Sequence, residues 1–67
     1  MTIKLNGSTE CLEPDHLSVR GLLAAKSWSF PLIIVKVNGV LVARDEWDTA
    51  RVADGDVVEA AHLMSGG

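Results

Sequence analysis

The residues of this sequence best suited to covalent chemistry are two glycines at its C-terminal end, Gly66 and Gly67. Glycine has no Cβ and loses the most conformational freedom on ordering, so a Gly-Gly pair is poor material for a folded element. Such a pair can, however, thread a narrow channel and present a terminal carboxylate to a partner's active site. We therefore expect residues 64–67 to form a flexible tail. In this tail Gly67 would be the reacting group, and Gly66 and Ser65 would give access to it.

A carboxylate must be activated before acyl transfer, typically as a mixed anhydride with AMP, because oxide is a poor leaving group. The sequence contains neither a Walker-type loop nor a G-x-G-x-x-G loop, and its glycine-containing turns resemble hairpin turns. We therefore expect no bound cofactor in this chain. ATP would be used by a separate activating enzyme, and this chain would be the substrate of that enzyme and not an enzyme itself.

Three residues around the start of the tail are candidates for contact with a partner: His62, Leu63 and Met64. Apolar groups at the end of a strand, beside a reactive terminus, otherwise have little to bury against. No carboxylate or hydroxyl partner is placed with His62 by spacing, which favours a contact role over general acid–base catalysis. We expect no catalytic residue. The alternative for the tail alone is a frayed end without function.

The remaining polar side chains give weaker signals. Cys11 is expected to be a small apolar strand residue without chemistry, and His16 to lie in a polar loop. No second cysteine or histidine stands at zinc-ligand spacing, so we expect neither a disulfide nor a metal site. Trp47 is expected to close the edge of the core. Acidic residues concentrate between positions 45 and 59, typical of a solvated face; the alternative is steering toward a basic enzyme surface.

Composition sets the class of protein. A chain of 67 residues makes one small domain with a minimal core, too small for a deep catalytic cleft. It is 48% apolar and 22% charged, which predicts a folded chain, and its net charge of −3 argues against nucleic-acid partners. The longest apolar run, Leu32–Val35, is too short for a membrane span, and the N-terminal residues lack a secretory signal pattern, so we expect a cytoplasmic protein without membrane partners.

Turn and periodicity signals predict the elements that position the tail. In chain order they are a hairpin over Thr2–Leu12 around Asn6-Gly7, a helix capped by Ser18 and ending near Lys26, a second hairpin over Leu32–Val42 around Asn38-Gly39, a short helical turn capped by Asp45, a tight turn at Asp54-Gly55 and a last strand over Asp56–Leu63. This order predicts an α+β domain over residues 1–63. It is the pattern of a β-grasp fold, a mixed sheet of about five strands with one helix packed on one face.

Three finer expectations concern packing. In the last strand, Val58 and Ala60 are expected to face the core and Glu59 the solvent, which keeps the carboxylate in water. Gly21 inside the helix predicts a close approach of the helix to the sheet. The nearly continuous apolar run from Leu32 to Val37 predicts a core strand covered on at least part of both faces.

The chain resembles the ThiS family, the ubiquitin-like sulfur carriers of thiamin biosynthesis, over nearly its whole length. The resemblance is carried by Leu5-Asn6-Gly7, Leu22-Leu23, Val35-Lys36-Val37-Asn38-Gly39, Arg44 with Trp47, Gly55-Asp56-Val57-Val58-Glu59 and Gly66-Gly67. The chain departs from the family at Ser65, where many members carry a third glycine, and at Ala60 and Ala61, which are smaller than expected.

The resemblance implies three partners. An E1-like adenylyltransferase of the ThiF type would adenylate Gly67, a sulfur-donating enzyme would supply the sulfur that replaces AMP, and a thiazole synthase of the ThiG type would take the sulfur from the resulting thiocarboxylate. Alternatives within the fold are a carrier like the small subunit of molybdopterin synthase or a ubiquitin-like protein modifier. A plain interaction module is the alternative from another class.

Overall fold

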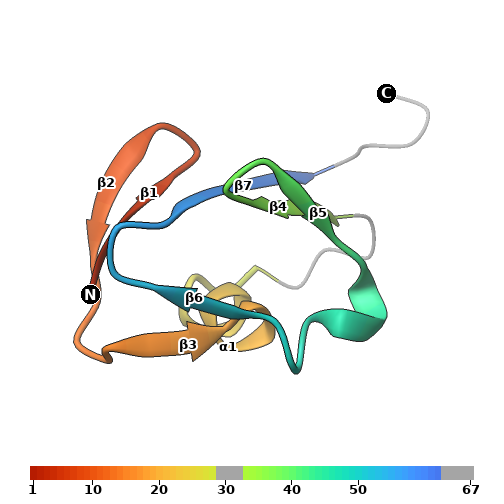
Figure 1. Ribbon diagram of the computed structural model, residues 1–67, viewed down its shortest axis with the longest axis horizontal. Coiled ribbons are helices and arrows are strands. Elements are labelled where there is room, and N and C mark those ends of the chain that lie inside the picture. Colours follow the sequence, from red (N-terminus) through yellow and green to blue (C-terminus); the bar gives the residue numbers. More distant parts are fainter. Residues whose placement is uncertain (29–32, 63–67) are drawn as a thin grey trace.

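The larger sheet of the protein is mixed. The computed structural model describes residues 1–28 and 33–62 (Figure 1). In sheet order, the strands within those residues are β2 (Ser8–Cys11), β1 (Thr2–Leu5), β7 (Val57–His62), β4 (Ile33–Val37) and β5 (Val40–Val42). The β1–β7 pair is parallel and the other neighbours are antiparallel. This is the five-stranded mixed sheet that the sequence predicts.

Both hairpins of this sheet form as predicted, because each turn has an Asn-Gly pair. Asn6 and Gly7 have φ of 52° and 83°, and Asn38 and Gly39 have φ of 52° and 81°. A two-residue hairpin turn of the favoured type needs positive φ at both central positions, which glycine adopts freely and asparagine tolerates. The turn residues therefore determine the register of β1 with β2 and of β4 with β5.

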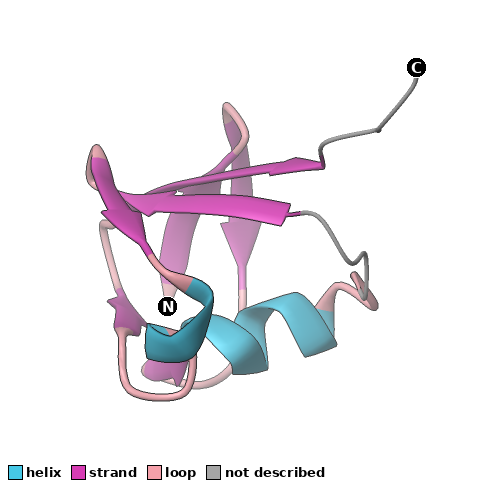
Figure 2. Ribbon diagram, turned by 90° about the vertical axis from the view of Figure 1, so that its right-hand side faces the viewer, coloured by secondary structure: helices cyan, strands magenta, loops and turns pink. Residues whose placement is uncertain are grey.

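The helix α1 (Val19–Ala25) covers one face of the sheet, as Figure 2 shows. Its N-cap is Ser18, as predicted: the Ser18 hydroxyl accepts a hydrogen bond of 3.0 Å from the Gly21 backbone N–H, satisfying a donor that has no partner inside the helix. The helix buries Val19, Leu22 and Leu23 against the sheet.

A second, two-stranded sheet was not predicted. Strand β3 (His16–Ser18) pairs antiparallel with β6 (Arg51–Ala53), so the expectation that His16 lies in a polar loop is wrong. Three residues are too few for the alternation of a strand to be recognised, and the partner strand lies far along the chain. The pairing lets Val52 become fully buried, with 0% of its surface exposed.

Two local expectations are corrected. A Cβ on Gly21 would lie 3.2 Å from Ser18 Oγ and 3.5 Å from Leu17 Cδ2, so the close neighbours of Gly21 are the residues entering the helix and not the larger sheet. The short helical turn is a 3₁₀ helix, η1 (Arg44–Glu46), whose N-cap is Ala43 and not Asp45. The Glu46 carboxylate accepts the Ala43 N–H at 3.3 Å, which lets the turn begin two residues earlier than predicted.

The core lies between the sheet, α1 and the η1 segment. Its buried members are Ile3, Leu5, Val19, Leu22, Leu23, Ile33, Val35, Trp47, Val52 and Val58. Trp47 is 5% exposed, which confirms its predicted place in the core, and its Nε1 donates to the Val42 carbonyl at 3.3 Å. Strand β4 is a core strand as predicted, but its two faces differ: Ile33 and Val35 are buried, whereas Ile34 on the other face is 39% exposed.

We predict that Val52→Ala lowers the free energy of unfolding by about 2 kcal/mol, because it leaves a cavity under the short β3–β6 sheet. Val40→Ala is the matched control in another strand of three residues, where Val40 is 66% exposed. It should change the free energy by no more than about 0.5 kcal/mol. Urea denaturation measures both, and equal losses in the two variants would contradict the core role of β6.

Candidate functional site

The residues that the sequence predicts to react follow β7 in the chain. Ser65, Gly66 and Gly67 lie outside the described residues, as do Leu63 and Met64, so their predicted roles stay predictions. The backbone of His62 is the last described part of β7 and is paired in register with Ile33 of β4. The structure therefore describes β7, which precedes the predicted site residues, and the backbone of one of those residues, His62.

Strand β7 is an interior strand, paired on both edges. Residues Lys4 and Leu5 of β1 lie opposite Val57 and Val58, and β4 pairs with β7 from Val37 opposite Val58 to Ile33 opposite His62. Val58 is 1% exposed, Ala60 is half-buried and Glu59 is exposed, which confirms the predicted register. The strand that precedes the predicted tail is thus held on both edges.

Two asparagines of the hairpin turns also bind β7 through their side chains. Asn38 accepts the Val57 N–H at its Oδ1 at 2.9 Å and donates its backbone N–H to the Val57 carbonyl at 2.7 Å. Asn6 accepts the Ala60 N–H at its Oδ1 at 2.8 Å, and its Nδ2 donates to the Ala60 carbonyl at 3.1 Å. Sequence analysis identified both residues as turn formers and missed these bonds, since their partners are distant in sequence.

Part of the acidic segment, predicted as a solvated face, has a structural role at the start of β7. The half-buried Asp56 accepts the Ala53 N–H at 2.9 Å and the Asn38 Nδ2 at 3.2 Å. Asp54 accepts the Thr2 N–H at 2.7 Å. These carboxylates close the turn between β6 and β7 and tie it to the beginning of β1 and to the β4–β5 turn.

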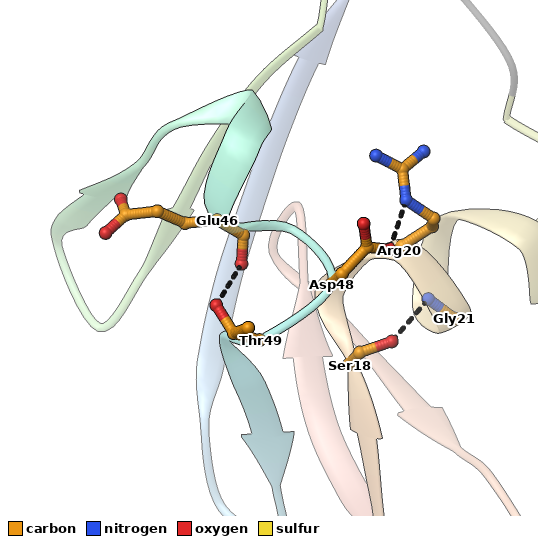
Figure 3. Close-up of polar contacts among 6 residues, drawn as sticks. All are labelled: Ser18, Arg20, Gly21, Glu46, Asp48 and Thr49. Carbon is orange, nitrogen blue, oxygen red and sulfur yellow. Dashed lines mark hydrogen bonds and ion pairs between the residues drawn. The ribbon is translucent and has the colours of Figure 1, made fainter.

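The Trp47 segment has a structural arrangement as well. The guanidinium carbons of Arg20 and Arg44 lie 5.6 Å and 4.9 Å from the centroid of the Trp47 ring, within the range of cation–π attraction. Arg20 also forms an ion pair with Asp48, and the Thr49 hydroxyl donates to the Glu46 carbonyl at 3.2 Å (Figure 3). The Arg20 contacts join the residues that follow η1 to the N-terminal end of α1.

The sheet face opposite α1 exposes apolar side chains beside β7. We define the outer patch as Ile34 (39% exposed), Leu41 (59% exposed) and the exposed Ala61. Ile34 lies directly opposite Ala61 in the register, and Leu41 lies opposite Lys36, so it is a diagonal neighbour of Ile34. The outer patch therefore lies at the end of β7 from which the tail continues.

Three further features of residues 1–28 and 33–62 concern metal-binding groups, the free cysteine and membrane-spanning helices. There, no group of three or more His, Cys, Asp or Glu side chains is placed to hold a metal ion. Cys11 is exposed, with its Sγ 3.7 Å from Thr2 Oγ1. The described helices include none long and apolar enough to cross a membrane.

A mixed sheet crossed by one helix, with the last strand inserted between the first and fourth, defines a β-grasp domain. A crystal structure of a thiamine biosynthesis protein (ThiS) from Geobacter metallireducens superposes with a TM-score of 0.89 at 32% identity over all of both chains. A solution structure of a thiamine biosynthesis protein from the same organism has a TM-score of 0.81 at 32% identity, covering all of this chain and 88% of that one.

Sequence comparison gives the same result. The Sulfur carrier protein ThiS of Bacillus subtilis (strain 168) is 26% identical over 65 residues, 97% of this chain and 98% of the relative. The sequence profile of the ThiS family matches residues 2–67. The chain belongs to the ThiS family, the sulfur carriers of thiamin biosynthesis. The predicted fold class and the predicted family are both confirmed, and family membership implies partner enzymes in thiamin biosynthesis.

We predict that Asp56→Ala lowers the free energy of unfolding by about 1 kcal/mol, because the Ala53 N–H and the Asn38 amide lose their acceptor. Asp45→Ala is the matched control, since within the described residues Asp45 makes no side-chain hydrogen bond. Thermal unfolding of both variants measures the difference. A loss in Asp45→Ala as large as in Asp56→Ala would show that net charge, and not the turn contacts, causes the effect.

Proposed function

We propose that this chain carries sulfur as a thiocarboxylate on Gly67 and delivers it to a thiazole synthase of the ThiG type. The observation that carries the proposal is the family match, which runs from residue 2 to residue 67 and so includes Ser65, Gly66 and Gly67. The interior position of β7 supports it, since a carrier that offers only its terminal carboxylate needs a fixed base for its tail. The carrier itself would then need no catalytic side chain.

Loading of the sulfur onto Gly67 would take two steps, both in partner enzymes. A Gly67 carboxylate oxygen attacks the α-phosphorus of ATP in a ThiF-type adenylyltransferase, so that pyrophosphate leaves and an acyl adenylate remains. A sulfur nucleophile at the oxidation level of sulfide, delivered by a sulfur-donating enzyme, then attacks the carbonyl carbon. The C–S bond forms, the C–O bond to AMP breaks, and AMP leaves without net oxidation or reduction. ATP is therefore a substrate of the partner, which is consistent with action in the cytoplasm.

We propose the outer patch as the face that docks on the activating enzyme. Ala61 belongs to the patch and lies one residue before the end of β7, so a protein that binds the tail also lies against this face. Helix α1 covers the opposite face of the sheet, so Ile34 and Leu41 stay exposed to solvent. Exposed apolar side chains close to a reacting terminus favour a protein partner. The predicted contact residues His62, Leu63 and Met64 follow Ala61 in the sequence.

We predict that the wild-type chain gains the mass of one sulfur-for-oxygen exchange after incubation with its activating enzyme, ATP and a sulfur donor. Deletion of Gly67 should abolish this gain, since the main-chain carboxylate would then belong to Gly66 and end one residue short of the reacting position. Intact-mass spectrometry measures the result, and thermal unfolding of the deletion variant serves as the control for folding. Larger, protein-sized adducts would indicate a modifier, and an unchanged wild-type mass would contradict sulfur carriage. Transfer of the sulfur to a molybdopterin precursor but not to thiazole synthase would indicate the other pathway.

We predict that Leu41→Ser raises the KM of the activating enzyme for this carrier about tenfold and leaves kcat unchanged, because an exposed apolar contact is lost from the outer patch. Val40→Ser is the matched control: Val40 is also exposed, at 66%, and its side chain points to the other side of the same strand. Its KM should stay within about twofold of wild type. Equal KM values for the two variants would argue against docking on this face.

A further inference from the structure

The side chain of Asn6 takes the place of a strand residue next to β7. The parallel pairing of β1 with β7 ends at Leu5 opposite Val58, and the Asn6 backbone N–H donates to the Val58 carbonyl at 2.9 Å. Beyond this point β1 turns away, because Asn6 begins the turn to β2 with φ of 52°. The Asn6 carboxamide, however, bonds both the N–H and the carbonyl of Ala60, at 2.8 Å and 3.1 Å.

A carboxamide is suited to this substitution because it carries the same donor and acceptor as a peptide group. The two bonds extend the β1 edge of β7 by one residue pair beyond the last paired residue of β1. Ala60 lies two residues before the end of β7, and the opposite edge of this end is held by β4, where Ile34 and Ile33 face Ala61 and His62. Asn6 therefore holds the second edge of β7 close to the place where the tail begins.

We propose that Asn6 is a positioning residue for the chemistry at the C-terminus. Strand ends fray unless both edges are held, and fraying of β7 increases the conformational freedom that must be lost when the tail enters an active site. By bonding Ala60, Asn6 fixes the direction in which the chain leaves the sheet. This role deepens the proposed function and rests on it, because it concerns activation of Gly67 by an adenylating enzyme.

The second Asn-Gly turn offers a matched comparison. Asn38 has the same φ of 52°, is exposed like Asn6, and also binds the β7 backbone with its side chain. It contacts Val57, at the start of the strand and far from the tail. Loss of the Asn38 carboxamide should therefore affect the stability of β7 without affecting the direction of the tail.

The test compares Asn6→Gly with Asn38→Gly in the full chain, since glycine adopts positive φ without strain and removes only the carboxamide. Amide hydrogen exchange should show faster exchange of the Ala60 N–H in Asn6→Gly alone. Pyrophosphate release in the presence of the activating enzyme and ATP measures activation. The KM for the carrier should rise about fivefold in Asn6→Gly, with kcat unchanged. A fivefold rise corresponds to the loss of about one net hydrogen bond. Asn38→Gly should stay within about twofold of wild type.

A conservative variant separates positioning from general destabilisation. Asn6→Asp keeps an acceptor for the Ala60 N–H but loses the donor to the Ala60 carbonyl, so its KM should lie between those of wild type and Asn6→Gly. The positioning role is overturned if Asn6→Gly has the wild-type KM, or if Asn38→Gly raises the KM equally. If the wild-type chain is not activated at all, the proposed function fails together with this role, whereas an unchanged KM in an active system refutes the role of Asn6 alone.

Discussion

The structure depends on the insertion of β7 between β1 and β4. This strand is bonded along both edges, parallel to the first strand and antiparallel to the fourth, and it contributes the buried Val58 to the core. The sheet becomes continuous only when this last strand is in place, since β1 and β4 have no direct pairing in the described structure. The strand that precedes the C-terminal residues is thus held along both of its edges.

This constraint explains the division of the molecule into two faces. On one face, α1, η1 and the β3–β6 pair cover a small core that includes Trp47, and the turns around β7 use Asp54 and Asp56 as backbone acceptors. On the other face, the outer patch stays exposed beside the end of β7. This combination suits the proposed function, in which the domain would hold its C-terminus for partner enzymes and present the outer patch to them.

Local interactions made much of the fold predictable. The Asn-Gly turns, the Ser18 cap and the alternation of Val58, Glu59 and Ala60 each depend on residues a few positions apart, and all have the predicted geometry. Features that join distant segments were missed. The β3–β6 pair has strands of three residues, too short to show a period. The exposure of Ile34 was missed because the nearly continuous apolar run of β4 does not show which of its side chains face the helix.

The sequence by itself determined the hairpins, the helix start, the β-grasp order and the family, because turn geometry, capping and the Gly66-Gly67 motif are properties of neighbouring residues. The tertiary structure decided what these residues do beyond their own segment. Asn6, a turn former by its neighbours, also holds Ala60, 54 residues later, because the parallel β1–β7 pairing brings its carboxamide to the backbone of the last strand. Hydrogen-bond partners at such separations are set by strand order, and strand order follows from packing the whole chain.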